Sequence, residues 1–423
     1  MKQSGIDWIG EIPDDWKISK AKTILRNKSI KNHPDAEVLS LYRDLGIVPK
    51  NSRDDNHNVT SDDTASYKFV QKGELVLNKM KTWQGSLAVS DYEGIVSPAY
   101  YVCEFTNQEI DKKYIHYLLR SKMYAQEFER LSTGLRVGQW DLNIDNFLNT
   151  PIVYPPKKAT QQRIAEYLDK KVSEIDSIIE ESKKSIEEYK AWKQSVIFEA
   201  VTGKNLNCKK KDSGIEWIGE IPENYKLIRF KFLLKEKLQY GANSSGIEFN
   251  SDLPRYIRIT DIKDSKTLYD ENKLSLSEVD AKDYILDDND ILFARSGATS
   301  GKCFIYKKEI GKATFAGYLI RAKIDETKLL PNFLVLYTMT KAYEEWKNQV
   351  CIQATIQNIS AEKYVNLIVP VPPLPEQESI AKMLDSKCAQ IDSLIAEKES
   401  LIADLMEYKK SLIFEVVTGK RSI

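Results

Sequence analysis

The chain has 423 residues, and its 62 basic side chains are balanced by 62 acidic ones, so the net charge is zero. This balance excludes a protein that binds nucleic acid through bulk positive charge, and it confines any DNA-binding surface to local patches. The sequence has no apolar run long enough for a membrane span, no signal peptide, and no cysteine or histidine at metal-ligand spacing. We therefore expect a soluble, cytoplasmic protein of two or three domains without a structural metal.

The sequence repeats itself in two places. Residues 4–13 read SGIDWIGEIP and residues 213–222 read SGIEWIGEIP, with nine identities in ten positions. Residues 156–204 align without gaps to residues 372–420 with 22 identities in 49 positions, whereas chance gives about three. The order is therefore short repeat, variable region and long repeat, twice over. The predicted segments are 1–155, 156–204, 205–371 and 372–423.

The first variable region is predicted to be mixed α/β. Extended patterns occupy 68–77 and Gly94–Phe105, and a helical pattern follows over Asp111–Leu131. The region closes with an extended segment, Phe147–Pro156, that leads into prolines.

The second variable region has the same order of elements. Extended patterns occur at Tyr256–Ile262, 284–294 and Phe315–Ile324, a helical pattern covers Pro331–Val350, and Tyr364–Pro373 is the closing extended segment. Both regions thus predict strands, an embedded helix and a final strand before the long repeat.

The long repeats carry an a/d heptad pattern, in which apolar residues alternate at steps of four and three. Polar residues interrupt this seam at matching places, Ser182 and Lys193 in one copy and Lys398 and Lys409 in the other. A proline before each repeat and a glycine after it indicate helices of about 43 residues, or roughly 65 Å. The apolar seam residues are Leu168, Val172, Ile175, Ile179, Ile186, Tyr189 and Val196, and then Leu384, Cys388, Ile391, Ile395, Ile402, Leu405 and Leu412.

A single amphipathic helix on a globular core would show the same period, but two copies of equal length and register favour a mutual pair. The sequence thus predicts an α+β fold. Two globular mixed α/β domains are joined by two long helices that form an antiparallel coiled coil with pseudo-two-fold symmetry.

No catalytic motif in the sequence is convincing. The [ND]PP[YF] loop of DNA N-methyltransferases is absent, and Gly297–Cys303 (GATSGKC) is one residue short of a phosphate-binding loop. Glu271–Lys273 has the ExK spacing of some nucleases, but no Pro-Asp at a nearby strand end supports it. We therefore predict neither catalytic residues nor metal ligands in this chain.

Several predicted loops instead combine Arg or Lys with Asn or Gln and an aromatic residue or glycine. Arginine and amide side chains read base edges in DNA, while Lys and Ser hold phosphates. In the first variable region the candidates are Arg43, Lys50, Asn51, Arg53, Asn78, Lys79, Lys81, Trp83, Gln84, Arg136 and Gln139. In the second they are Tyr240, Asn243, Ser244, Ser245, Arg258, Lys263, Arg295, Ser296, Lys302, Gln353 and Gln357.

Each such loop alone could be an ordinary solvated surface, but several of them in both halves favour DNA binding. We expect Arg295 to donate to a guanine and Lys302 to contact a phosphate. The alternative for Arg295 is that it only braces the end of a strand.

The whole chain resembles the specificity subunit of type I restriction-modification systems. The match includes GIxWIGEIP before each domain, PPLPEQESIAKMLD at Pro372–Asp385, and FEAVTGK and FEVVTGK at the helix ends. Gly73–Val102 looks like one common target-recognition type, and YIRITDI with Asn289–Lys302 looks like another. Lys157–Gln161 (KKATQ) departs from the family's usual PLxEQ.

This resemblance implies a non-catalytic protein in which each domain reads one half of a bipartite, asymmetric DNA site. It further implies that the helix pair sets the spacing and carries two modification subunits, which bind S-adenosylmethionine and methylate adenine. Restriction subunits, which supply the motor and the nuclease, would complete the complex. Two alternatives remain open: a self-contained methyltransferase or nuclease with duplicated DNA-binding arms, and a coiled-coil scaffold that contacts only proteins.

Overall fold

The structure is a computed structural model that describes residues 1–43, 45–52, 64–134, 140–297, 299–351 and 358–423. It divides into two compact units. The first unit contains Met1–Lys183 and Glu399–Ile423, and the second contains Lys184–Lys398. Both chain termini therefore belong to the first unit.

The first unit is built on a four-stranded antiparallel sheet with the order β4 (Leu25–Lys28), β11 (Tyr100–Phe105), β8 (Leu75–Asn78) and β9 (Leu87–Val89). Alternate side chains of a strand point to opposite faces of its sheet. Leu75 and Leu77 accordingly pack in one core with α1 (Lys112–Arg120) and α2 (Lys122–Leu131), while Val76 belongs to a second core.

Shorter elements complete this unit. The second core includes β5 (Leu39–Tyr42), β6 (Gly46–Pro49), β7 (Lys68–Val70) and β10 (Gly94–Val96). β1 (Lys2–Gln3) precedes the first short repeat and pairs with β2 (Glu11–Ile12) inside it, and β3 (Lys17–Lys20) pairs with β14 (Pro151–Tyr154). The remaining elements are β12 (Ser132–Thr133), β13 (Asp141–Leu142) and α3 (Ile144–Asn149).

The second unit repeats this plan. Its four-stranded sheet has the order β18 (Gln239–Tyr240), β25 (Leu319–Ala322), β22 (Ile291–Ala294) and β23 (Cys303–Ile305), and it packs on α6 (Pro331–Thr338) and α7 (Lys341–Cys351). A second sheet has the order β19 (Ile247–Glu248), β21 (Leu274–Ser275), β20 (Arg255–Ile257) and β24 (Ala313–Phe315). Smaller elements are β15 (Lys210–Asp212), β16 (Glu220–Pro222), β17 (Lys226–Arg229), α5 (Glu278–Ala281), α8 (Ala361–Tyr364) and β26 (Ile368–Val371).

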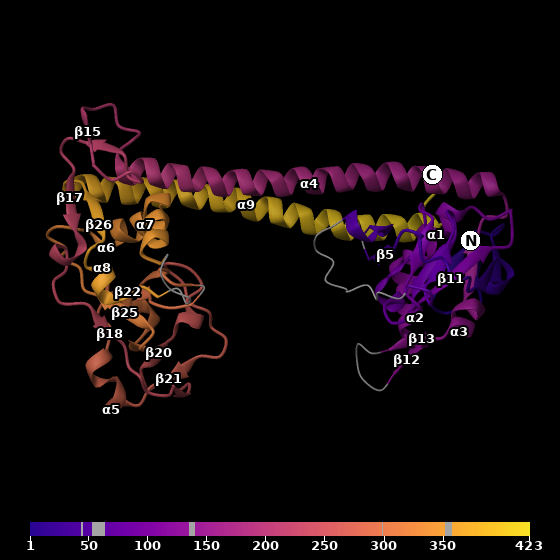
Figure 1. Ribbon diagram of the computed structural model, residues 1–423, viewed down its shortest axis with the longest axis horizontal. Coiled ribbons are helices and arrows are strands. Elements are labelled where there is room, and N and C mark those ends of the chain that lie inside the picture. Colours follow the sequence, from indigo (N-terminus) through magenta and orange to yellow (C-terminus); the bar gives the residue numbers. More distant parts are fainter. Residues whose placement is uncertain (44, 53–63, 135–139, 298, 352–357) are drawn as a thin grey trace. The chain divides into compact units, whose positions relative to one another are not determined.

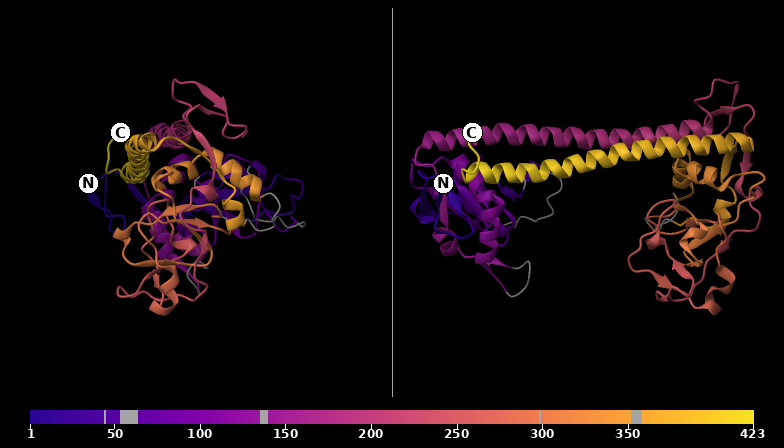
Figure 2. Two further views of the ribbon diagram at one scale, coloured as in Figure 1. Left: turned by 90° about the vertical axis from the view of Figure 1, so that its left-hand side faces the viewer. Right: turned by 180° about the vertical axis from the view of Figure 1, so that it is seen from behind.

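The two long helices are confirmed. They are α4 (Lys158–Thr202, 45 residues) and α9 (Leu374–Val417, 44 residues), and within each unit they lie side by side in every view (Figures 1 and 2). All fourteen predicted apolar seam side chains are buried or half-buried. Gly203 and Gly419 follow the helices with φ of +70°, a left-handed conformation that glycine adopts without steric cost and that ends a helix.

Glycine is also required after each helix by close packing. A Cβ on Gly203 would lie 2.5 Å from Pro222 Cγ, and a Cβ on Gly419 would lie 2.4 Å from Pro13 Cγ. Each long helix thus ends against the last residue of a short repeat, α4 in the second unit and α9 in the first. This contact explains why the two repeats occur together in each half of the sequence.

Several predicted elements are shorter than the sequence patterns suggested. The helical patterns 111–131 and 331–350 each form two helices, and the first breaks where Ser121 is extended, with ψ of 151°. The pattern Tyr256–Ile262 is wrong beyond Ile257, because residues 259–261 form a 3-10 turn. Similarly, Phe147–Asn149 ends α3 rather than beginning the closing strand.

Among the described residues, no helix is long and apolar enough to cross a membrane. Within the same ranges, no group of three His, Cys, Asp or Glu side chains is close enough to hold a metal ion.

Candidate nucleic-acid interface and helix pair

The turn after β8 holds the best-ordered candidates of the first domain. The Trp83 indole donates to the Met80 carbonyl at 2.9 Å and lies 5.4 Å from the Trp140 ring, and the Lys79 ammonium lies 4.8 Å from the Tyr101 ring. These contacts brace the turn. Lys81 and Gln84 are exposed on it and are accessible to a ligand.

Other first-domain candidates follow β5 and β6. Arg43 and Asn51 are exposed, and Lys50 is half-buried. The Arg43 carbonyl accepts a hydrogen bond from the Arg120 guanidinium, so this turn is tied to the end of α1. Five candidates lie outside the described residues: Arg53, Arg136, Gln139, Gln353 and Gln357.

In the second domain the structure brings together candidates from two separate loops. Arg295 follows β22, and the carbon at the centre of its guanidinium lies 4.9 Å from the centroid of the Tyr240 ring. The Tyr240 hydroxyl accepts from the Ala361 N–H at 3.0 Å, which fixes the ring. Within the described part of the chain, Arg295 Nε is buried without a hydrogen-bond partner. Such a donor is costly to leave unpaired unless a ligand or water meets it.

An exposed tyrosine that the sequence analysis missed adjoins this arginine. The Arg295 N–H donates to the Tyr318 carbonyl at 3.0 Å, and the Tyr318 side chain is 65% exposed. Asn243 Oδ1 would lie 2.0 Å from a Cβ on Gly317, so the exposed amide of Asn243 also reaches this turn. We refer to Tyr240, Asn243, Arg295 and Tyr318 as the Arg295 cluster.

Two other second-domain candidates are engaged within the fold. The Arg258 guanidinium donates two hydrogen bonds to the Asp261 carboxylate, at 2.7 and 3.1 Å, and this bonding raises the pKa of Arg258. The Lys302 ammonium donates to the carbonyls of Ile262 and Lys263 at 2.7 and 3.0 Å. Both side chains therefore brace the 259–263 turn.

The remaining candidates flank these groups. Lys263 and Ser245 are exposed, and Ser244 and Ser296 are half-buried.

Two of the four polar breaks in the helix seams, Lys193 and Lys409, are explained by reciprocal ion pairs. Lys409 on α9 lies 2.7 Å from Asp176 on α4 in the first unit, and Lys193 on α4 lies 2.6 Å from Asp392 on α9 in the second. Positions 193 and 176 of the first long repeat correspond to 409 and 392 of the second. The lysine in each copy thus pairs with the aspartate of the other, and the helices are antiparallel in both units.

A row of exposed apolar side chains runs beside the seam. Each member immediately precedes a seam position and is 38% to 51% exposed. Because the same heptad position of two antiparallel helices lies on the same side of their seam, these residues mark one side of the pair within each unit. The members, here called the exposed apolar row, are Ile178, Leu401 and Tyr408 in the first unit and Trp192 and Leu394 in the second.

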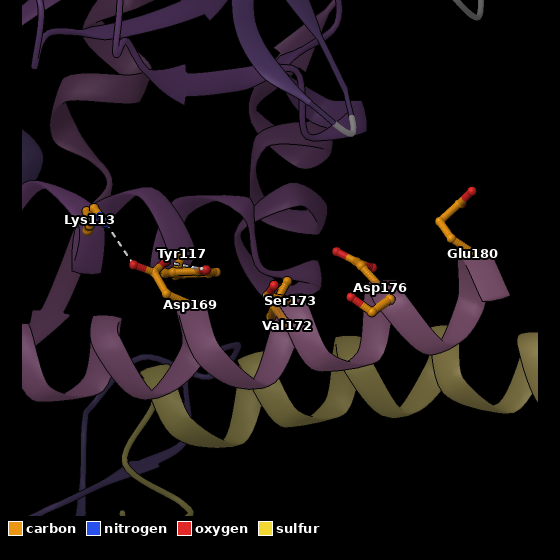
Figure 3. Close-up of a pocket in the computed structure, with 8 residues that line it drawn as sticks. Lys113, Tyr117, Asp169, Val172, Ser173, Asp176 and Glu180 are labelled. Atoms are coloured by element: carbon orange, nitrogen blue, oxygen red, sulfur yellow. Dashed lines mark hydrogen bonds and ion pairs between the residues drawn. The ribbon is translucent and has the colours of Figure 1, made fainter.

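Between α1 and α4 a groove carries three acidic side chains (Figure 3). Asp169 accepts from Lys113 at 2.8 Å and from the Tyr117 hydroxyl at 2.7 Å, and the hydrogen bond from Lys113 to Asp169 raises the pKa of Lys113. Asp176 holds Lys409, and Glu180 accepts from Lys183. Since each carboxylate already has a cationic partner, the groove has the character of a structural contact rather than that of a catalytic site.

Comparison with known proteins points to one family. The family model described as the type I restriction modification DNA specificity domain matches residues 13–188 and 211–402. The StySPI specificity subunit of Salmonella potsdam is 21% identical over 97% of this chain and 90% of its own length. The EcoKI subunit of Escherichia coli K12 is 22% identical with the same coverage, and the MjaVIII subunit of Methanocaldococcus jannaschii is 25% identical, covering 97% of this chain and 93% of its own length.

Two solved structures share the fold. One, from a study of complex assembly and conformational transition in the type I R-M system, is 14% identical and covers 97% of this chain and all of its own, with a TM-score of 0.75. The HsdS subunit of Thermoanaerobacter tengcongensis is 12% identical and matches over the full length of both chains, with a TM-score of 0.57.

Proposed function

The chain belongs to the type I restriction-modification DNA specificity family, and we propose on this premise that it is the sequence-reading subunit of such a complex. Each domain reads one half of a bipartite DNA site. The observation that carries this proposal is the pair of domains, which share one sheet order on matched helix ends but present different loops. Two different readers on one duplicated frame fit an asymmetric site.

In the second domain we assign base reading to the Arg295 cluster. An arginine whose guanidinium lies over an aromatic ring, as Arg295 lies over Tyr240, presents a fork of donors that suits the two acceptors of guanine in the major groove. The exposed amide of Asn243 can both donate and accept, and exposed Tyr318 offers an aromatic face and a hydroxyl. Because Lys302 already holds two carbonyls, a bracing role is now the stronger proposal for it than a phosphate contact.

In the first domain Lys81 and Gln84 are the proposed readers, and Arg43 and Asn51 are further candidates. All four are exposed. A lysine beside an amide on a braced turn combines a phosphate contact with a base contact. The brace from Trp83 matters because a preorganised loop loses less entropy on binding.

The exposed apolar row is the proposed docking surface for two modification subunits. Ile178 and Leu394 occupy equivalent positions of the two long repeats, as do Trp192 and Tyr408. Two equivalent apolar patches fit two copies of one partner, and aromatic and aliphatic anchors are typical of interface cores. We assign S-adenosylmethionine binding and adenine methylation to those subunits, not to this chain. Restriction subunits would join the same complex, in the cytoplasm where the DNA lies.

The proposal is tested by mapping DNA methylation in cells that express this chain with its modification subunits. We expect one bipartite motif that disappears when the chain is omitted. Replacing residues 17–150 with the corresponding segment of a relative should change the bases of one half-site only. A swap that alters both halves or neither would contradict the assignment of one domain to one half-site. Methyl transfer by the purified chain alone would instead support a self-contained enzyme.

A further inference from the structure

A buried glutamine at the start of each long helix makes three hydrogen bonds: it donates to two backbone carbonyls and accepts from one backbone N–H. Gln161 of α4 donates to the carbonyls of Pro155 at 2.9 Å and Glu109 at 3.2 Å, and its carbonyl accepts from the Asp111 N–H at 2.8 Å. The side chain is fully buried. Asp111 caps the start of α1, so the amide of Gln161 joins the long helix to the helical layer of the first domain.

The second unit repeats the arrangement with different neighbours. Gln377 of α9 donates to the carbonyls of Pro372 at 2.8 Å and Lys328 at 3.0 Å, and it accepts from the Leu330 N–H at 2.8 Å. Leu330 immediately precedes α6, which is the counterpart of α1. Gln161 lies in the KKATQ segment, which otherwise departs from the family's PLxEQ pattern. The final glutamine, which makes these contacts, is the residue that this segment shares with the pattern.

An ion pair holds each domain to its helix eight residues further on. Lys113 of α1 lies 2.8 Å from Asp169 of α4, as Figure 3 shows, and Lys266 lies 2.8 Å from Asp385 of α9. The two aspartates are equivalent in the repeat, whereas the lysines come from unrelated parts of the two domains. Two contacts more than two helical turns apart fix the angle between the domain and the long helix, whereas one contact alone would let the domain pivot about it.

We propose that Gln161 and Gln377 are positioning residues that set the angle of each recognition domain on its helix, and thereby the DNA spacing at which both half-sites are read. This inference rests on the proposed function. A domain of about 150 residues has a radius of gyration of about 15 Å. A tilt of about 13° therefore moves points one radius of gyration from the pivot by about 3.4 Å, the rise of one base pair, and loops further from the pivot move by more. A small loss of angular restraint at the glutamine is therefore enough to let the complex accept a DNA spacer of the wrong length.

The test compares Gln161→Met and Gln377→Met with the parent chain, each assembled with its modification subunits. The substrates are DNA duplexes whose half-sites keep their sequence while the spacer varies from two base pairs shorter to two longer. We expect the methylation rate at spacers one base pair from the optimum, relative to the rate at the optimum, to rise at least fivefold. Base preference within each half-site should not change.

Matched controls are Gln162→Met and Gln390→Met, which alter exposed glutamines on the same two helices and should leave the ratio at the parent value. Gln161→Glu keeps the length and the acceptor oxygen but loses both N–H donors, and it should give an intermediate ratio. A uniform loss of rate at all spacers, an unchanged ratio, or failure of both Gln161 variants to assemble would overturn the positioning role. A parent complex that methylates isolated half-sites would instead refute the proposed function itself.

Discussion

Two adjacent isoleucines on α4 separate the stability of the helix pair from its role in assembly. Ile179 is a seam residue that is 7% exposed, and it packs in the core of the first unit. Ile178 precedes it, belongs to the exposed apolar row and is 44% exposed. Replacing each in turn by alanine removes the same atoms from neighbouring positions of one helix, so each variant controls for the other.

The expected magnitudes differ because the burial differs. Ile179→Ala loses the transfer free energy of three buried carbons and leaves a cavity, which together cost about 2–4 kcal/mol of the free energy of unfolding. Ile178→Ala removes side-chain surface that is nearly half exposed, and alanine is the better helix former by a few tenths of a kcal/mol. Its effect on unfolding should therefore stay within about 0.5 kcal/mol.

Ile179→Ala should have the larger effect on stability, whereas Ile178→Ala should have the larger effect on affinity for the modification subunit. Burying the exposed part of Ile178 against a partner is worth about 1 kcal/mol, so Ile178→Ala should weaken binding roughly fivefold. Urea unfolding followed by circular dichroism gives the stability, and titration with the purified subunit gives the affinity. Equal destabilisation by both variants would show that the seam register is wrong. Unchanged affinity in Ile178→Ala would remove Ile178 from the docking surface.

Three further predictions concern recognition, spacing and pH. Arg295→Ala should cost about 1–3 kcal/mol at one position of one half-site, while binding to a panel of single-base variants shows the other half unchanged; an identical profile would exclude Arg295 from reading. Four residues inserted into α4 near Gly203 should lengthen the preferred spacer without changing the half-site bases, as methylation of a spacer series will test. Burial, reinforced by the charge of Arg120, lowers the pKa of His116 to about 3. Its folded pKa lies below the unfolded value, so stability falls as pH drops from about 6.5 towards 3, by about 2 kcal/mol at pH 5. His116→Asn should remove that loss from urea midpoints at pH 7 and pH 5, and an unchanged pH dependence would refute the assignment.

The helix seam could be predicted from the sequence because a heptad pattern is local. Burial of Ile175 or Leu384 follows from its spacing to seam neighbours on the same helix, and no knowledge of the domains is needed. The same pattern contains the exposed apolar row, since Ile178 and Leu394 are apolar at a position that flanks the seam in both copies.

The Arg295 cluster could be predicted only in pieces. Arg295 follows β22, and Tyr240 is the last residue of β18. These two strands lie on either side of β25 in the sheet, and no local sequence pattern predicts that strand order. Tyr318 was hidden because Phe315–Ile324 reads as one strand, whereas β24 ends at Phe315 and β25 starts at Leu319. The loop between them places the tyrosine beside the arginine.

The charge of a side chain does not by itself show whether that side chain is engaged within the fold. Lys302 resembles a phosphate contact, but its hydrogen-bond acceptors are carbonyls about forty positions earlier in the chain. The partner of Arg258 is only three residues away at Asp261, and the R-x-x-D spacing at the start of a helical turn is a recognisable cap. This spacing distinguishes Arg258 from basic candidates that have no acceptor nearby in the sequence.

The duplication separates the parts of this protein that must agree from those that must differ. Gln161 and Gln377 each donate to two carbonyls and accept from one N–H, and the reciprocal pairs join Lys409 to Asp176 and Lys193 to Asp392. Changing one member of such a set would disturb a contact whose geometry the other copy shares. The Arg295 cluster carries no such constraint, because it contacts neither long helix in any of the bonds that hold it. The loops can therefore change what they bind while the frame keeps its geometry.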